Sequence, residues 1–192
     1  MIRRSFNGAG LHGPALLFFA IVWLLAGCAH RPATSPAPRD LAAALSALDA
    51  SVDAHDAAVL ATVAVQTSSD LAAAYRARPP AWLHNIFVNA GWRPRGLCYH
   101  WADDLEARLR GENLATLEIH RIVARPGTSR EHSALAVTAR GRPYATGVVL
   151  DAWRGSGRLF WGPVPQDKYR WGLRSPNAPP GTAPARRLDP WE

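Results

Sequence analysis

The sequence predicts an α+β domain over residues 40–171, with helices first and an antiparallel β-sheet after them. Apolar residues recur at three- and four-residue steps as far as residue 110, which is the period of an amphipathic helix. Between residues 115 and 161 they form short runs that alternate in part and are separated by turns rich in Pro and Gly. Short turns between successive strands favour antiparallel hairpins. Hydrophobic residues make up 48% of the chain, enough to build a core.

The N-terminus has the order of features found in a bacterial secretory leader. Arg3 and Arg4 supply positive charge, and residues 14–24 are apolar but shorter than the ~20 residues that span a bilayer. Leu25-Ala26-Gly27-Cys28 follows and resembles a lipobox, so that residues 1–27 would be a lipoprotein signal peptide. The resemblance implies cleavage before Cys28 and a lipid anchor on that cysteine. Ala29 then implies the outer membrane, facing the periplasm. A plain signal peptide or a short membrane anchor is the alternative.

Residues 28–39 are rich in Pro, Ala, Ser and Thr and are expected to form a flexible tether. The formal net charge is +7, and loss of Arg3 and Arg4 with the leader leaves 7 − 2 = +5. The basic residues are dispersed and no nucleic-acid motif is visible, so no nucleic-acid partner is expected. A weak attraction to anionic lipid or cell-wall polymer is the alternative to plain surface charge.

Three helices are expected before the central motif. Asp40 is a candidate cap for a helix with apolar residues Leu41, Leu45, Leu48 and Val52. A second, short helix is expected from Ser69 or Asp70. Pro79-Pro80 opens a third over Ala81–Ala90, with Trp82, Ile86 and Phe87 toward the core and His84 as a surface or packing residue. Asp53, His55 and Asp56 do not share one helical face, which argues against a metal site there.

The helix that follows carries the main candidate residue. Cys98, Trp101, Leu105 and Leu109 recur at helical steps, and Gly111 is the expected end. Cys98 therefore lies in the first turn, beside the buried face. Unpaired amide groups and the helix dipole at an N-terminus stabilise an anion, which favours a reactive thiolate.

Four strands are expected after this helix: residues 115–124, 132–139, 144–150 and 158–161. Residues 172–192 hold many Pro, Gly and Arg residues and are expected to be a disordered tail. His132 begins the second strand, and Asp151 follows the third. A thiol, an imidazole and a carboxylate on a helix and two strands suit a cysteine nucleophile with its base and orienting acid.

Each of these residues also has a plainer interpretation. With Cys28 lipidated, Cys98 is the only thiol, and it could be an inert core cysteine. His100 and His120 compete with His132, although the side chain of His100 is expected on another face of the helix and His120 toward solvent. Asp151 could be a strand-end cap. Trp101, Trp153, Trp161 and Trp171 could line a cleft but more often serve packing.

The run Gly96-Leu97-Cys98-Tyr99-His100-Trp101-Ala102, followed by His132 and by Val148-Val149-Leu150-Asp151-Ala152-Trp153, resembles the transglutaminase-like core of the papain-like cysteine-enzyme superfamily. The resemblance covers about Trp92–Trp161. It implies a Cys-bearing helix packed on an antiparallel sheet, with Cys98 as nucleophile, His132 as base and Asp151 as orienting acid. The backbone amide of Cys98, and more weakly the side chain of Trp92, are the candidate oxyanion donors.

Two main functions remain open from the sequence. The first is a lipid-anchored cysteine hydrolase or acyltransferase acting on amide bonds of peptides or cell-wall cross-bridges. The second is a non-catalytic binding or scaffolding lipoprotein that keeps the fold. A redox role for Cys98 lacks the resolving cysteine that usually accompanies one. No cofactor is expected, and no metal either, because neither a second cysteine nor a close histidine pair accompanies Cys98.

Overall fold

The computed structural model describes residues 37–175, which form an α+β fold. The expected signal peptide, Cys28, most of the tether and residues 176–192 lie outside the described residues. The helices are α2 (Pro38–Ser46), α3 (Ala54–Ala74), α4 (Ala81–Asn89) and α5 (Cys98–Arg110). The strands are β1 (Leu117–Ala124), β2 (His132–Ala139), β3 (Val148–Asp151), β4 (Phe160–Pro163) and β5 (Gly172–Leu173). Two short 3-10 turns, η1 (Tyr144–Thr146) and η2 (Val164–Gln166), flank β3 and β4.

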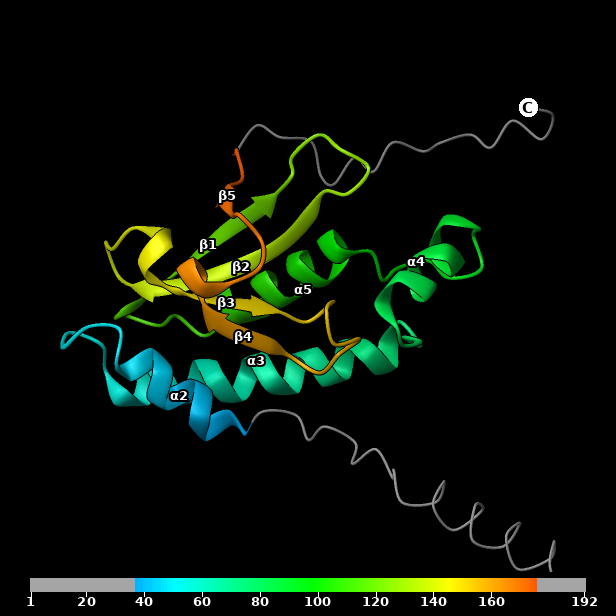
Figure 1. The fold of residues 1–192 in the computed structure, drawn as a ribbon. Coiled ribbons are helices and arrows are strands. Elements are labelled where there is room, and N and C mark those ends of the chain that lie inside the picture. The colour runs from blue at the N-terminus through cyan, green and yellow to red at the C-terminus, as the bar shows by residue number, and fades with distance from the viewer. Residues whose placement is uncertain (1–36, 176–192) are drawn as a thin grey trace, which may run out of the picture. The chain divides into compact units, whose positions relative to one another are not determined.

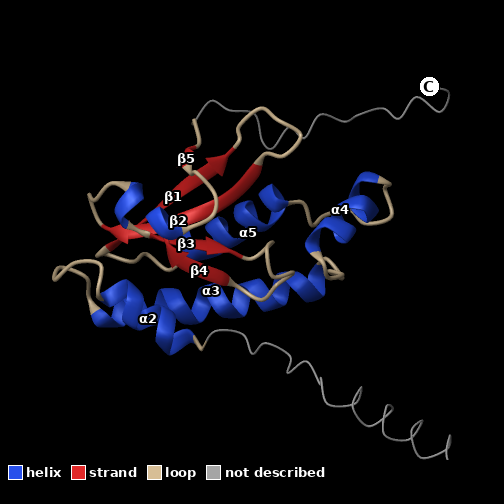
Figure 2. Ribbon diagram, viewed as in Figure 1, coloured by secondary structure: helices blue, strands red, loops and turns tan. Residues whose placement is uncertain are grey.

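The five strands form one antiparallel sheet in the order β4-β3-β2-β1-β5 (Figure 2). The meander expected from the short turns is therefore confirmed. β2 is the central strand and is buried along its whole length. The third expected strand is shorter than predicted, because Tyr144–Thr146 turns as η1 before β3 begins at Val148.

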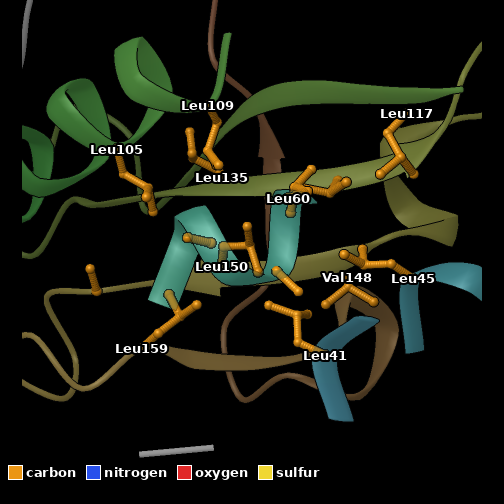
Figure 3. Close-up of a cluster of buried hydrophobic side chains, with 14 of the residues drawn as sticks. Leu41, Leu45, Leu60, Leu105, Leu109, Leu117, Leu135, Val148, Leu150 and Leu159 are labelled. Atoms are coloured by element: carbon orange, nitrogen blue, oxygen red, sulfur yellow. The ribbon is translucent and has the colours of Figure 1, made fainter. Parts of the chain in front are cut away.

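Helices α2, α3 and α5 cover one face of the sheet (Figure 1). Leucines of all three helices meet strand residues in one cluster, where Leu60 of α3 and Leu105 of α5 join Leu135 of β2 (Figure 3). These residues are at most 1% exposed. Burial of a Leu side chain contributes ~1.5–3 kcal/mol, so this layer is what fixes α5, and with it Cys98, against the sheet.

The opposite face of the sheet packs against the C-terminal segment. Val164 and Trp171 cover Ala134 and Ala136 of β2 and Val149 of β3. The chain then returns to the sheet edge as β5, which pairs with Ile122 and Val123 of β1. The disordered tail was expected from residue 172, so that boundary was wrong for these first residues. Their composition is typical of a loop, and only the open edge of β1 gives them strand partners.

The N-terminal helices differ from the prediction. α2 begins at Pro38 rather than after a cap at Asp40, because proline is preorganised for the first helical position and its missing N–H needs no partner there. α3 is one helix of 21 residues instead of a late helix from Ser69 or Asp70. Asp53 caps it by accepting hydrogen bonds from the backbone of His55 and Asp56, at 2.8 and 3.1 Å.

In α3 and α4, apolar character alone does not tell which side chains are buried in the core. α3 is long and apolar enough to span a bilayer by length and composition, yet Ala57, Leu60, Ala61 and Ala64 are fully buried in the core. On α4, Trp82 and Ile86 are 60% and 51% exposed, so the prediction that they face the core was wrong. The buried positions of α4 are Ala81 and His84 instead.

Candidate active site

Cys98 is the first residue of α5 and is partly buried. The loop that leads into it depends on Gly96, whose φ of +131° is disfavoured for L side chains. A Cβ atom at Gly96 would lie 2.2 Å from Nε2 of His84. The close approach of His84 therefore requires glycine immediately before the Leu97-Cys98 pair.

Three side chains hold this entry loop. Nδ1 of His100 accepts hydrogen bonds from the backbone of Gly96 and Leu97, at 3.1 and 3.2 Å. Trp101 donates from its indole to the carbonyl of Gly96 at 2.8 Å, and His84 Nε2 lies 3.0 Å from the carbonyl of Arg95. His84 is a buried packing residue, 2% exposed, and the role of His100 is to satisfy backbone amides before α5.

His132 and Asp151 come from neighbouring strands and lie together. His132 is the first residue of β2, and Asp151 is the last residue of β3. The β2–β3 register pairs Leu135 with Leu150, which brings His132 and Asp151 to the same face of the sheet, on a diagonal. His132 Nε2 donates to Asp151 Oδ2 at 2.6 Å, and the two residues are 4% and 2% exposed.

Cys98 meets this pair at the end of the sheet. The thiol is close enough to the imidazole of His132 to contribute to its raised pKa, and since Nε2 faces Asp151, Nδ1 is the ring nitrogen left for the thiol. Cys98 Sγ also lies 3.7 Å from the carbonyl oxygen of Glu131, the residue before His132. The three residues predicted from the sequence therefore form one contiguous set.

The electrostatics of the set favour a charged imidazole. Burial by itself lowers the pKa of His132, but the charge of Asp151 and hydrogen bonds to Asp151 and Cys98 outweigh burial and raise the pKa from 6.5 to about 9. Burial acts on Asp151 in the direction of a higher pKa, yet the charges of His132 and Arg154 hold it below its ordinary value.

Arg154 is the residue that sequence reasoning missed. Its backbone amide donates to Asp151 Oδ1 at 3.0 Å, and its Nε donates to Oδ2 at 3.1 Å. The other side of the guanidinium binds Asp167, at 2.9 and 3.3 Å, and lies 3.7 Å from the ring centroid of Phe160. Asp167 follows a Pro-rich stretch in which no sequence signal marks a structural carboxylate.

Aromatic rings enclose the imidazole. The ring centroids of Trp153, Tyr169 and Trp171 lie 4.8, 4.8 and 5.5 Å from that of His132. Trp153 also donates to Asn85 Oδ1 of α4 at 3.0 Å. Trp153 and Trp171 thus keep water from the His132–Asp151 pair, whereas Trp101, at 2% exposed, belongs to the core, and Trp161 packs against that core.

The remaining candidates lie elsewhere. Trp92 is 69% exposed and packs on Phe87 at 5.7 Å between ring centroids, and it does not line the cavity beside Cys98, so it is no oxyanion donor in this arrangement. His120 Nε2 lies 2.9 Å from Thr138 Oγ1, on a partly buried part of the sheet. The backbone amide of Cys98 remains the candidate donor.

Two cavities lie beside opposite ends of α5. One of about 100 Å³ is lined by Cys98, Asn85, Asn89 and Ser133 among others. A larger hollow of about 400 Å³ lies at the other end of α5, around Leu109 and Arg140, away from the three site residues. Of these two cavities, the smaller one contains the thiol. Within residues 37–175, no group of three or more His, Cys, Asp or Glu side chains has the arrangement of a metal site.

Comparison of the chain with family models, curated proteins and solved structures gave no match. The function of the site is therefore inferred from its own residues and geometry.

Proposed function

We propose that this chain is an envelope lipoprotein with a transglutaminase-like Cys98-His132-Asp151 site, acting as a cysteine hydrolase or acyltransferase on peptide or cell-wall amide bonds. The observation that carries the proposal is the 2.6 Å contact between His132 Nε2 and Asp151 Oδ2, with Cys98 Sγ 3.7 Å from the carbonyl oxygen of Glu131, the residue before His132. A nucleophile, a base and an orienting acid in mutual contact are the arrangement that acyl transfer through a thiol requires.

The proposed reaction has two halves. The Cys98 thiolate attacks the carbonyl carbon of an amide, the S–C bond forms, and the carbonyl oxygen becomes an oxyanion near the backbone amide of Cys98. As the C–N bond breaks, His132 gives its proton to the leaving amine, which leaves a thioester on Cys98. Water or a second amine then attacks the thioester carbon while His132 takes the proton of the attacking group, the C–S bond breaks, and the Cys98 thiolate leaves as the acid or the new amide is released. Hydrolysis and transfer differ only in this second nucleophile.

The papain-like fold is part of the same proposal. Its support is the position of Cys98 at the N-terminus of a helix packed on an antiparallel sheet, with His132 and Asp151 at adjacent strand ends. Each of these features agrees with what the resemblance of residues 92–161 implies. The order of the elements along the chain agrees as well.

The envelope location rests on the sequence of residues 1–28. If Cys28 carries lipid, Cys28→Ser moves the chain from the membrane fraction to the soluble fraction of cells, and the acylated N-terminal peptide disappears from its mass spectrum. An unchanged distribution, with no acylated peptide in the unmodified chain, would contradict lipid anchoring while leaving the Cys98 site untouched.

A non-catalytic binding lipoprotein is the second candidate. The observation in its favour is the 3.7 Å approach of Cys98 Sγ to the carbonyl of Glu131, because a thiol donating to a carbonyl is protonated and unreactive. In that case the cavity beside Cys98 would hold a peptide or glycan without chemistry.

The deciding experiment measures the rate at which iodoacetamide alkylates Cys98 between pH 5 and 9. The full-length chain in detergent is used, and the Cys98 peptide is quantified by mass spectrometry. The enzyme proposal expects rapid labelling that persists well below pH 8 and is slowed at least about tenfold by His132→Ala. His120→Ala is the matched control, since that imidazole contacts Thr138 away from Cys98, and it should leave the rate within a few-fold. Slow labelling that is indifferent to His132 would favour the binding lipoprotein.

A further inference from the structure

The cavity that opens beside Cys98 is lined mainly by uncharged polar side chains. Asn85 and Asn89 come from α4, Thr128 and Ser129 from the β1–β2 loop, and Ser133 from β2. Its volume of about 100 Å³ is well below the ~300–1,000 Å³ of pockets that enclose a whole ligand. It therefore has room for a small group of a larger substrate.

Ser133 is unusual among these residues. It is 2% exposed, and its Oγ has no hydrogen-bond partner among residues 37–175. Buried hydroxyls are nearly always paired, because an unpaired one loses its bonds to water without replacement. Among the described residues that have an unpaired buried side-chain atom, Ser133 is the one that lines the cavity of Cys98.

The sheet geometry separates Ser133 from the base. Consecutive strand residues project to opposite faces, so Ser133 shares the α5 side of β2 with Leu135 while His132 lies on the other side, toward Asp151. In the proposed reaction His132 protonates the leaving amine, so the amine side of the bond lies at His132. The cavity, which is lined by Cys98 and not by His132, is left for the acyl portion.

The one carboxylate of the cavity is already engaged. Glu131 accepts from the backbone of Gly127 at 2.7 Å through Oε2, and its Oε1 lies 3.5 Å from a guanidinium nitrogen of Arg174. Its charge is therefore compensated within the protein. Amide and hydroxyl groups remain to meet a ligand, and these match a neutral polar group better than a charged or aromatic one.

We infer that this cavity is the acyl-side subsite, that it takes a small uncharged residue of about glycine or alanine size, and that the Ser133 hydroxyl hydrogen-bonds the main-chain amide of that residue. This inference rests on the proposed function, since it requires attack by Cys98 on an acyl group. It narrows the substrate class to amides whose acyl-side residue is small. It also gives the Ser133 hydroxyl, which has no hydrogen-bond partner among residues 37–175, a partner in the substrate.

The test uses two peptide aldehydes, N-acetyl-glycinal and N-acetyl-phenylalaninal, as probes. The Cys98 thiolate adds to the aldehyde carbon, the S–C bond forms, the C=O π bond breaks, and the oxygen takes the proton from the His132 imidazolium. The product is a reversible hemithioacetal, with no oxidant or reductant involved. Its formation is read as protection of Cys98 from iodoacetamide in the full-length chain in detergent.

N-acetyl-glycinal should protect Cys98 at concentrations at least about tenfold lower than N-acetyl-phenylalaninal. Ser133→Ala should weaken protection by N-acetyl-glycinal about tenfold, the loss expected for one uncharged hydrogen bond. The same change should leave the melting temperature unchanged or higher, because it removes an unpaired buried hydroxyl. Ser68→Ala is the matched control: its buried hydroxyl donates to the carbonyl of Ala64 at 2.7 Å on α3, and its loss should not alter protection.

Equal protection by the two aldehydes, or protection that Ser133→Ala leaves unchanged, would overturn the subsite while leaving the Cys98 site intact. A lower melting temperature in Ser133→Ala with unchanged protection would assign the hydroxyl a purely structural role, with the same consequence. If neither aldehyde protects and alkylation is slow and indifferent to His132, the proposed function fails, and the subsite falls with it.

Discussion

Arg154 Nε lies 3.1 Å from Oδ2 of Asp151, the same oxygen that His132 contacts at 2.6 Å. Asp151 is thus held from two sides by cationic partners, and Arg154 is in turn held by Asp167. These contacts leave the carboxylate of Asp151 almost no freedom to turn. The carboxylate therefore keeps the imidazole of His132 oriented beside Cys98. Arg154 acts through Asp151 and is a positioning residue.

The Arg154–Asp167 pair should be strongly coupled in stability. Their side chains are 14% and 1% exposed, and removing one partner of a buried pair costs about 3–5 kcal/mol because it leaves the other charge uncompensated. Arg154→Met and Asp167→Asn should each lower the free energy of unfolding by about 3 kcal/mol. The free energy of unfolding lost by the double variant should be at least about 1 kcal/mol smaller than the sum of the losses in the two single variants. Urea unfolding of all four proteins measures this, and strict additivity would contradict the pairing.

Asp151→Asn should slow the chemistry of Cys98 without dismantling the site. Asparagine keeps the shape of the side chain but removes the charge that raises the pKa of His132, so less imidazolium is present at neutral pH. Alkylation of Cys98 at pH 7 should fall about fourfold, because a return of the His132 pKa from about 9 toward 6.5 lowers the imidazolium fraction at pH 7 from ~99% toward ~24%. Asp56→Asn is the control, because Asp56 binds Thr116 at 2.7 Å away from the site, and its alkylation rate should be unchanged. A rate in Asp151→Asn equal to that of the unmodified chain would argue against a charge-assisted pair.

Stability should fall at alkaline pH because of His132. Its pKa is raised from 6.5 to about 9 on folding, so its contribution is fully present below pH 6.5 and is lost as the pH rises through about 9. The shift corresponds to about 3 kcal/mol. Between pH 6 and pH 10 the free energy of unfolding should therefore fall in the unmodified chain. This fall should be about 3 kcal/mol larger than the fall in His132→Gln. Parallel pH profiles for the two proteins would show that His132 does not titrate this way.

Gly96→Ala should damage the entry to α5. The added Cβ would meet His84 Nε2 at 2.2 Å, and the φ of +131° is strained for alanine. We expect a loss of about 2–4 kcal/mol and slower labelling of Cys98. Gly91→Ala is the matched control, with a φ of +75° and nothing within 4 Å, and should lose only about 1 kcal/mol.

The same clash predicts a rescue. In a His84→Ala background the space beside residue 96 is open, so the further loss caused by Gly96→Ala should shrink toward that of Gly91→Ala. Thermal unfolding of the four combinations measures the difference. An undiminished loss would assign the effect to backbone strain alone rather than to contact with His84.

Much of the fold could be predicted where local pattern and packing agree. β2 begins and ends at the expected residues, α5 ends at Gly111 as expected, and its apolar stripe at Trp101, Leu105 and Leu109 is buried. α3 was missed because its Ala-rich sequence has weak amphipathic contrast and polar residues on both sides. Trp82 and Ile86 were wrongly assigned to the core because apolar character alone does not tell which face of α4 has a neighbour.

Within the candidate site, the sequence by itself determined the residue types and their order: a cysteine opening a helix, a histidine opening a strand and an aspartate closing another. Local sequence determines those positions, because short stretches of residues specify where helices begin, where strands end and where the chain turns. Only the tertiary structure decided that His132 rather than His100 or His120 meets Asp151, that Arg154 and Asp167 complete the arrangement, and that Ser133 faces the thiol's cavity. Strand register and side-chain packing bring together residues far apart in the chain, and no local pattern encodes those distances.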